Sequence, residues 1–441
     1  MQRPSWLPSL ATSRFCRSEV EGTVPPPEGT TSFMRLALFV GPGLMIAVGY
    51  MDPGNWATDL EAGSRYGYGL LFIILLSSLA GMLLQTLSMR VGLVTGKTLA
   101  ELSRARYPRP INLAFWILAE IAIVACDVAE VLGSALAFKL LFGVSMKWGI
   151  AITALDTIII LGLRGQGFRA IESIILALVG TIAICFFAEL VLIKPYWPDV
   201  AMGLLPNTRY FSEAEAWYLA IGILGATVMP HNLYLHSSII LTRPYAPTRA
   251  GKEEALRFGV IDTVGSLGIA FFVNAAILIL AGAAFHGEGK SVVTGIDDAY
   301  RLLTPVVGGS VAPLLFAIAL LAAGQSSTFT GTIAGQVILE GFLDLQIPAW
   351  QRRVITRSLA LAPAFVGIWI LGDASIGRLL VMSQVVLSLQ LPFVIFPLLR
   401  FAGDSSLMKD FEIGKILKLS GWFVFVLITC ANAWLIYRLA Q

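Results

Sequence analysis

Long apolar runs separated by short polar segments dominate the chain and predict a polytopic, all-α membrane protein. Runs of about 20 apolar residues are long enough to cross a bilayer as a helix, and such runs recur along almost the whole sequence. Eleven spans are predicted from this pattern. They cover residues 36–58, 69–94, 112–138, 148–163, 170–193, 215–240, 258–285, 308–338, 353–371, 377–399 and 419–438.

Two of the predicted spans contain a proline flanked by polar residues. The first span holds Asp-Pro-Gly-Asn at 52–55, and the sixth holds Met-Pro-His-Asn at 229–232. A proline removes a hydrogen bond from a helix and clashes with the preceding turn, and polar side chains are costly within lipid. Broken segments in corresponding positions of the two halves of a chain are typical of the binding site of a secondary transporter.

The placement of charged residues predicts how the spans are oriented. If the N-terminus is cytoplasmic, the connections on that side carry most of the arginine and lysine residues, as the positive-inside rule requires. With eleven spans, the C-terminus then lies outside. The absence of an Asn-x-Ser/Thr sequon fits a bacterial inner membrane, so a multi-pass plasma-membrane protein is predicted.

The odd number of spans predicts a transport core, residues 35–400, built from two inverted 5+5 repeats. Spans one to five, about 35–194, and spans six to ten, about 210–400, would begin on opposite sides of the membrane. Each repeat would open with a broken helix, which is the architecture of the leucine-transporter-like fold. Residues 401–441 would add a cytoplasmic linker and an eleventh helix, and residues 1–34 a disordered cytoplasmic tail.

Composition agrees with a membrane protein and narrows the function. Hydrophobic residues make up 56% of the 441 residues and charged residues 13%, whereas a soluble domain carries about 25% charged residues. The four cysteines show no spacing typical of a disulfide framework or a zinc site. The sequence contains no ATP-binding P-loop and no nucleophile–base arrangement, so neither an ATP-driven pump nor an enzyme is predicted.

The residues at the two breaks offer both hard and soft metal ligands. Asp52 and Asn55 are three residues apart and share a face or a short unwound turn. Unwinding before Pro230 would expose the carbonyl of Ala226 beside the thioether of Met229. Hard cations prefer oxygen ligands alone, whereas a thioether favours a softer transition metal. These donors predict transport of Mn²⁺ or Fe²⁺, which they do not rank, with tolerance of Co²⁺, Cd²⁺ and Zn²⁺, and no resident cofactor.

Titratable residues in the predicted third span and at the second break suggest a route for protons. The third span supplies Glu120, Asp127 and Glu130, of which the last two share a helix face. His231 titrates near neutral pH when unperturbed, and both a proton relay and a packing hydrogen bond remain open for it. Asp52 is the simplest coupling device, because protonation would weaken its attraction for a metal.

The motifs resemble those of the natural-resistance-associated macrophage protein (Nramp) family of proton-coupled divalent metal transporters, particularly its bacterial manganese transporters. The similar segments are Asp-Pro-Gly-Asn at 52–55, Ala-Thr-Val-Met-Pro-His-Asn at 226–232, and Gly-Gln-Ser-Ser-Thr-Phe-Thr-Gly-Thr-Ile-Ala-Gly-Gln at 324–336. The resemblance extends over residues 35–440 and implies the inverted-repeat fold. It implies metal coordination by Asp52, Asn55, the Ala226 carbonyl and Met229.

The resemblance also assigns expected roles to residues outside the two breaks. Gln384, in the predicted tenth helix, matches a position that contributes to the metal site in the inward-closed state. Arg352 and Arg353 lie at the cytoplasmic end of the predicted ninth helix, where a family arginine pairs with an acid of the third helix along the proton exit. Structural charge pairing is the alternative interpretation of these acids. Relatives that carry Mg²⁺ or Al³⁺ lack the methionine, so its presence favours manganese and iron.

The principal prediction is a proton-coupled importer of divalent transition metals that works by alternating access. A sodium-coupled amino-acid transporter of the same fold would not need a thioether beside an aspartate. An ion channel needs no inverted pair of broken helices, and a receptor would usually add a soluble sensing domain. The expected partners are metal ions, protons and the lipid bilayer, without nucleic acid, and the chain is expected to function as a monomer.

Overall fold

The computed structural model describes residues 32–154, 168–207, 209–287, 293, 295–307, 311–345, 349–372 and 375–439, and every regular element in these ranges is a helix. The longer ones are α2 (Ser32–Phe39), α3 (Pro42–Gly49), α4 (Pro53–Tyr66), α5 (Leu71–Thr95), α6 (Leu99–Arg106), α7 (Arg109–Phe142), α8 (Met146–Thr153), α10 (Phe168–Ile193), α12 (Ala214–Thr227), α13 (Pro230–Ile239), α14 (Arg249–Phe285), α15 (Ile296–Val307), α16 (Val311–Leu343), α17 (Ala349–Leu371), α18 (Ile376–Ala402) and α20 (Lys415–Leu439). Shorter ones are α11 (Trp197–Gly203) and α19 (Ser405–Met408).

The helices agree closely with the predicted spans. Within the described residues, seven unbroken helices are long and apolar enough to cross a membrane, and one further pair is bent by 56° at its break. That pair joins Arg35–Gly49 to Pro53–Tyr66 and corresponds to the predicted first span. The sixth span is divided into α12 and α13, and the ninth corresponds to α17. Of the fourth, only α8 at its start is described, and the predicted tail lies almost wholly outside the described residues.

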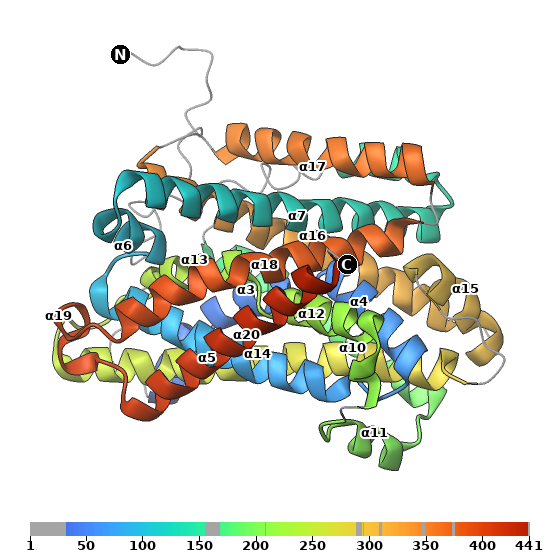
Figure 1. The fold of residues 1–441 in the computed structure, drawn as a ribbon, viewed down its shortest axis with the longest axis horizontal. Helices are drawn as coiled ribbons and strands as arrows, with labels where there is room; N and C mark the ends of the chain where they lie inside the picture. The colour runs from blue at the N-terminus through green and yellow to red at the C-terminus, as the bar shows by residue number, and fades with distance from the viewer. Residues whose placement is uncertain are drawn as a thin grey trace.

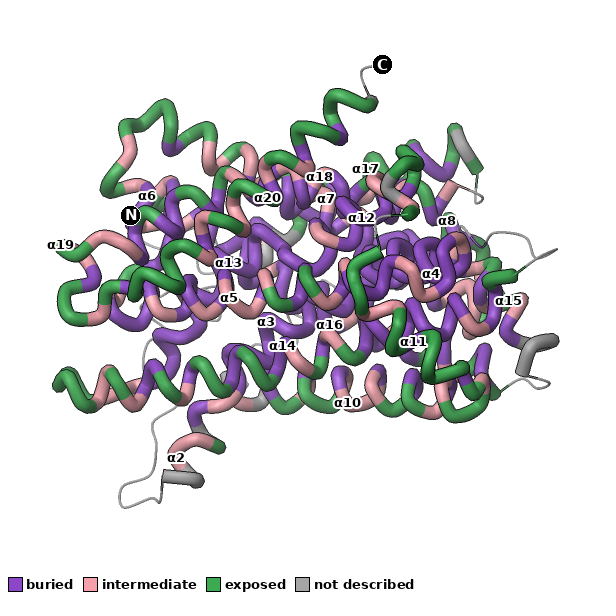
Figure 2. The backbone as a smooth tube through the Cα atoms, turned by 60° about the horizontal axis from the view of Figure 1, so that its bottom comes forward, coloured by how far each residue is buried: buried purple, intermediate pink, exposed green. Residues whose placement is uncertain are grey.

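The broken helices occupy the interior of the molecule. In Figure 1, α7 and α17 run along one edge and α14 along the opposite one, with α3, α4, α12 and α13 between them. Every residue of α3 is buried, and every residue of α4 except Arg65 is buried. Figure 2 shows the same contrast, since the central helices are mainly buried whereas α10 and α20 expose much of their length.

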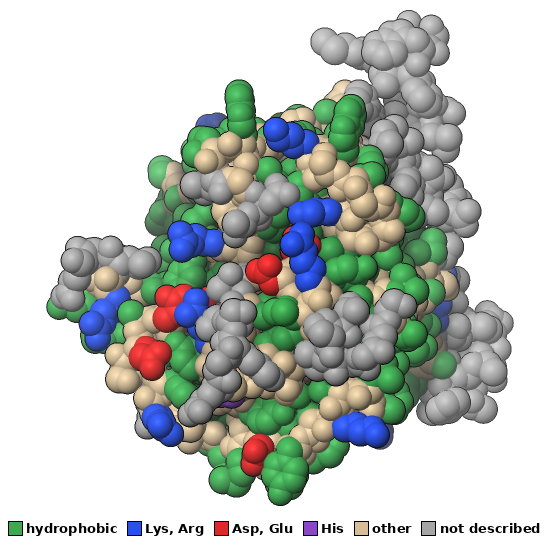
Figure 3. All heavy atoms as spheres, turned by 90° about the vertical axis from the view of Figure 1, so that its right-hand side faces the viewer, with side chains coloured by type: hydrophobic (Ala, Val, Ile, Leu, Met, Phe, Trp, Pro, Cys, Tyr) green, Lys and Arg blue, Asp and Glu red, His purple; other side chains and the backbone are tan. Residues whose placement is uncertain are grey.

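The end of the molecule that carries α15 presents a mixture of charges (Figure 3). The charge pattern of the sequence assigns this end to the outside, where few basic residues are expected. Two of those basic residues are neutralised by acids. Lys139 Nζ lies 3.2 Å from Asp297 Oδ2, and Arg65 Nη2 lies 2.9 Å from Glu61 Oε1.

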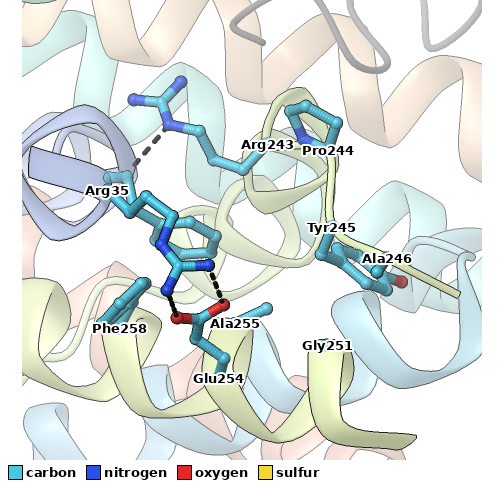
Figure 4. Close-up of a pocket in the computed structure, with 10 residues that line it drawn as sticks. Arg35, Arg243, Pro244, Tyr245, Ala246, Gly251, Glu254, Ala255 and Phe258 are labelled. Atoms are coloured by element: carbon cyan, nitrogen blue, oxygen red, sulfur yellow. Dashed lines mark hydrogen bonds and ion pairs between the residues drawn. The ribbon is translucent and has the colours of Figure 1, made fainter. Parts of the chain in front are cut away.

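At the opposite end, two ion pairs attach the segment α2–α3 to its neighbours. Arg243 is buried, and its Nη2 donates to Glu172 Oε1 at 2.6 Å and to the Val40 carbonyl at 3.1 Å. Arg35 of α2 pairs directly with Glu254 of α14, and both side chains line a cavity of about 330 Å³ (Figure 4). These contacts hold the first half of the broken helix against α10 and α14.

Gly41 permits the close approach of this buried ion pair. It has a φ of +147°, a region that residues with a side chain rarely adopt. A Cβ there would lie 2.4 Å from both Arg243 Nη2 and Glu172 Oε1. On the other side, Gly43 N donates to Asp262 Oδ2 at 2.7 Å, so a carboxylate of α14 accepts from the start of α3.

Candidate metal centre

The proline at each break deprives a backbone carbonyl of its regular helical donor. α3 ends at Gly49 and α4 begins at Pro53, while α13 begins at Pro230, directly after Met229. A helical carbonyl accepts from the N–H four residues later, and proline has no N–H. Pro53 therefore leaves the Gly49 carbonyl without its helical donor, and Pro230 does the same to the carbonyl of Ala226.

Both of these carbonyls lie within reach of the same side-chain nitrogen. Asn55 Nδ2 donates to Asp52 Oδ1 at 2.7 Å, to the Ala226 carbonyl at 3.1 Å and to the Gly49 carbonyl at 3.4 Å. One point in the buried interior is thus surrounded by a carboxylate and two carbonyl oxygens. Oxygens converging in this way are ligands for a divalent cation, and rotation of the Asn55 amide would present its own oxygen to the same group.

Asp52 begins α4 and is held in place by the helix that it starts. Its Oδ1 accepts from the Asn55 backbone N–H at 2.8 Å, which makes it the N-cap residue. The carboxylate is fully buried, and among the described residues its Oδ2 has no hydrogen-bond partner. A buried carboxylate oxygen with unused lone pairs can bind either a metal ion or a proton.

Met229 brings a sulfur atom to the same place. The residue is fully buried at the start of α13. A Cβ at Gly49 would lie 3.3 Å from Met229 Sδ and 2.2 Å from Asn232 Nδ2. Gly49 must therefore lack a side chain for α13 to approach α3. The Met229 thioether therefore lies beside Gly49, whose carbonyl oxygen accepts from Asn55 Nδ2.

Gln384 reaches the first turn of α4 from α18. A Cβ at Gly54 would lie 1.7 Å from Gln384 Nε2, so the amide packs directly on the residue between Pro53 and Asn55. The side chain is fully buried, and its Oε1 has no hydrogen-bond partner within the described part of the chain. The structure therefore brings Gln384 against the turn that carries Asp52 and Asn55, two of the residues predicted as metal ligands.

Three further groups near the centre were not selected from the sequence. The Gly49 carbonyl could have been found by counting four residues back from Pro53. Asn274 of α14 donates to the Tyr50 carbonyl at 2.8 Å and to Asn55 Oδ1 at 3.3 Å. It thereby fixes the orientation of the Asn55 amide, which no local pattern reveals.

The third group is the carboxylate of Asp59. It lies on α4 seven residues after Asp52, which is two helical turns and the same face. Asp59 is buried, and its Oδ2 has no hydrogen-bond partner among the described residues. Its spacing from Asp52 was the available signal in the sequence.

A series of polar side chains leads from His231 into the interface between α7 and α16. Cys126 Sγ lies 3.8 Å from His231 Nε2 and 3.7 Å from Glu130 Oε1. Thr328 Oγ1 donates to Glu130 Oε2 at 3.1 Å. The sequence did not select Cys126, because a lone cysteine in an apolar segment gives no sign of its neighbours. The structure places its thiol between two of the predicted proton-pathway residues.

Two glycines of α16 make room for charged side chains. A Cβ at Gly331 would lie 3.0 Å from Glu130 Oε1 and 3.8 Å from Asp127 Oδ1. A Cβ at Gly335 would lie 2.9 Å from Arg352 Nε. The Gly-x-x-x-Gly spacing, typical of helices that pack closely, here accommodates ionisable groups from α7 and α17.

The series ends at an ion pair between α17 and α7. Arg352 Nη2 donates to Glu120 Oε1 at 2.8 Å and to Glu120 Oε2 at 3.0 Å, and Trp116 Nε1 donates to Glu120 Oε1 at 3.0 Å. The pairing of an arginine of the ninth span with an acid of the third thus involves Glu120. Arg353 belongs to α17, but its side chain lies outside the described part of the structure.

The second histidine of α13 lies apart from this series. His236 Nδ1 is 3.1 Å from Gln85 Oε1 of α5, and the side chain is buried. This contact is an interhelical hydrogen bond between α13 and α5.

The chain is similar to known transporters over almost its whole length. Residues 43–438 match the family described as natural resistance-associated macrophage protein-like. A divalent metal cation transporter, MntH, of Ralstonia nicotianae is 59% identical over 432 residues, which is 98% of both chains. MntH 1 of Pseudomonas aeruginosa, also a divalent metal cation transporter, is 59% identical over 431 residues and again 98% of both chains.

Solved structures agree with this similarity. The crystal structure of the Eremococcus coleocola manganese transporter with an aromatic bis-isothiourea compound superposes with a TM-score of 0.87 at 38% identity, and the match covers 94% of this chain and 89% of that one. MHP1, a nucleobase-cation-symport-1 family transporter, has a TM-score of 0.59 at 13% identity, over 90% of this chain and 93% of that one, and so shares only the fold. The prediction of a multi-pass, leucine-transporter-like fold is confirmed, and the relatives are transporters rather than enzymes. The chain belongs to the natural resistance-associated macrophage protein-like family.

Proposed function

We propose that the protein imports Mn²⁺ or Fe²⁺ together with protons, by alternating access across a bacterial inner membrane. Relatives named as divalent metal cation transporters support the general activity. The observation that carries the proposal is the convergence of Asn55 Nδ2 on the Asp52 carboxylate and the carbonyls of Ala226 and Gly49, beside the sulfur of Met229. A metal ion would replace that nitrogen as the common partner of these groups.

The donor set accounts for both selectivity and release. Asp52 contributes the one carboxylate, and in the described residues no group of three His, Cys, Asp or Glu side chains is placed to hold a metal. A single charge binds a divalent ion weakly enough for it to leave. Met229 favours Mn²⁺, Fe²⁺, Co²⁺, Cd²⁺ or Zn²⁺ over Ca²⁺, because a thioether is a poor ligand for hard cations. Gln384 would complete the site from α18 when α4 and α18 are packed together.

The proposed proton route follows the polar series between α7, α13 and α16. A proton displaced from Asp52 by the metal would pass by His231 to the pair Asp127 and Glu130. The proton would then leave the protein past the ion pair of Glu120 with Arg352. Arg353 lies beside Arg352 in the first turns of α17.

The chain is proposed to act as a monomer in the membrane, with its N-terminus in the cytoplasm and its C-terminus outside. The transported metal is then its substrate, with no resident cofactor and no nucleic-acid partner. The two broken helices would change their packing against α14 and α18 to expose the site to each side in turn. Uptake of radiolabelled amino acids in a sodium gradient, without uptake of Mn²⁺, would contradict the proposal.

Uptake of Mn²⁺ and Ca²⁺ into proteoliposomes tests the role of Met229. We expect Met229→Ala to reduce the preference for Mn²⁺ over Ca²⁺ by at least about tenfold. Mutating a residue that only hydrogen-bonds to a metal ligand already lowers metal affinity by about this factor. Met89→Ala is the matched control, because Met89 is also fully buried but packs against Gly259 of α14. If Met229→Ala excludes Ca²⁺ as well as the unmodified protein does, the thioether does not determine selectivity.

A further inference from the structure

A basic pocket lies at the end of the molecule that the charge pattern assigns to the cytoplasm. It has a volume of about 590 Å³ and lies where the last turns of α6 and α18 meet the first turns of α20. Three cationic residues line it, one from each helix: Arg106, Arg400 and Lys418. These helices are distant in sequence, so the concentration of positive charge is a property of the fold.

The positive charge in this pocket is largely unpaired. Across the described ranges, no ion pair or hydrogen bond involves the guanidinium group of Arg106 or that of Arg400. Lys418 Nζ approaches Glu412 Oε1 only to 3.9 Å. Guanidinium groups form strong bidentate hydrogen bonds with phosphate oxygens. The charge of Arg106 acts on Asp404 without an ion pair between them, so both guanidinium groups keep their hydrogen-bond donors for a phosphate group.

One acidic residue, Asp404, lies in the pocket and does not cancel this charge. Its Oδ1 accepts from the Ser406 backbone N–H at 2.9 Å and from Ser406 Oγ at 2.6 Å. The Ser406 hydroxyl hydrogen bond lowers the pKa of Asp404, so the group stays ionised at neutral pH. Three cations near two carboxylates, Asp404 in the pocket and Glu412 beside Lys418, leave a net positive charge that favours an anion.

The opposite wall of the pocket is aromatic and borders the surface that faces lipid. Phe396 and Trp422 line the pocket, and their ring centroids are 6.0 Å apart. On the adjoining face of α20, Leu419 is 74% exposed and Phe423 is 66% exposed. Apolar side chains this exposed on a membrane helix are expected to contact acyl chains. The pocket therefore joins a cationic wall to the edge of the hydrocarbon layer.

We propose that this pocket binds the phosphate headgroup of an anionic phospholipid from the cytoplasmic leaflet. Arg106, Arg400 and Lys418 contact the phosphate, and the first part of an acyl chain lies along Phe396 and Trp422. A soluble phosphate would satisfy the cations alone, whereas a lipid also uses the aromatic wall. The bound headgroup joins the cytoplasmic ends of α6 and α18 to α20, the helix outside the two repeats.

Native mass spectrometry of the intact protein released from detergent tests this assignment. The probes are phosphatidylglycerol, phosphatidylcholine with the same acyl chains, and inorganic phosphate. We expect retention of phosphatidylglycerol and an increase in melting temperature with this lipid alone. Replacing Arg106, Arg400 and Lys418 together by Gln should weaken retention, by about fivefold for each positive charge removed near the membrane surface.

The matched control replaces three other exposed cations of the same membrane side, Arg109, Lys409 and Lys415, which do not line the pocket. The control should keep its phosphatidylglycerol, and the single variants Arg106→Gln and Lys418→Gln repeat the test with less risk to folding. Equal loss in both triple variants, equal retention of phosphatidylcholine, or the same stabilisation by inorganic phosphate would each overturn the proposal. Metal uptake is not the readout, so the result is independent of the transport function.

Discussion

Asn55 is the residue at which the two broken helices meet. Its side-chain nitrogen contacts the carbonyl that each proline deprives of its helical donor, as well as the carboxylate of Asp52. Asn274 of α14 holds the other end of the same amide. An aspartate at this position would place a second carboxylate against Asp52. An alanine would remove the side-chain donor of the Ala226 carbonyl, whereas the Gly49 carbonyl would keep the backbone N–H of Asp52 at 3.4 Å. The amide can therefore present either its nitrogen or, after rotation, its oxygen to this group.

The acids of α7 allow the proposed proton route to be tested residue by residue. Replacing Asp127 by Asn and Glu130 by Gln keeps the volume of both side chains but removes their ability to carry a proton. We expect proton entry driven by Mn²⁺ to fall about a hundredfold, the usual effect of removing positioned proton-transfer groups. The measurement is the internal pH of proteoliposomes during Mn²⁺ uptake.

Glu189→Gln is the control for this experiment. Glu189 is a buried carboxylate of α10, and both of its oxygens lack a partner in the described residues. Its neutralisation should leave proton entry unchanged. Metal-linked proton flux that persists in the double variant would show that the protons travel by a route other than Asp127 and Glu130.

At the scale of elements, the first half of the broken helix is held by two ion pairs of different character. Arg243 and Glu172 have side chains that are 1% and 4% exposed, whereas Arg35 and Glu254 are 42% and 35% exposed. A buried pair that loses one partner leaves a desolvated charge behind. An exposed pair is hydrated and screened by salt, so its loss changes little.

We therefore expect Glu172→Gln to destabilise the protein far more than Glu254→Gln. The first change should lower the free energy of unfolding by about 3 kcal/mol, the lower end for breaking a buried pair, because Arg243 keeps the carbonyls of Phe39 and Val40 as partners. The second should cost less than about 1 kcal/mol. Denaturation of both variants in the same detergent measures the difference. Equal destabilisation would mean that burial does not distinguish the two pairs.

At the scale of the whole molecule, the array of helices was predictable from the sequence, but the contacts inside it were not. Hydropathy locates spans because each must be apolar over the thickness of a bilayer, and the predicted third span, 112–138, lies within α7. Hydropathy carries no information about partners. The Asn274–Asn55 contact joins residues 219 positions apart, and Cys126 and His231 are 105 apart.

Similar limits apply to helix length. The predicted seventh span begins at 258, but α14 begins at Arg249. Its first turns are polar, and they continue the helix beyond the apolar region, so hydropathy could not detect them. Proline positions were more informative. A proline removes a backbone donor from its own helix, and this local effect does not depend on the tertiary fold. These positions identified the Ala226 carbonyl before any contact was known.

The predicted orientation of the whole array can be measured with alkaline phosphatase fusions, since this enzyme is active only outside the cytoplasm. Fusions that end after Leu204 or Arg438 should be active, because these positions fall on the side with few basic residues. Fusions after Thr248 or Gly403 should be inactive. An active fusion at Gly403, or an inactive one at Arg438, would show that the number of spans or the direction of insertion is wrong.

The meeting of both breaks at Asn55 has a mechanical consequence. The oxygen group is complete only while Gly49 of α3 and Ala226 of α12 lie against the same side chain. An ion bound there would bridge the two repeats, because its ligands come from both. Separation of the repeats would release the ion. If this group is the proposed metal site, neither repeat alone supplies all of its ligands. A chain in which the two breaks do not meet is then expected to bind no metal ion.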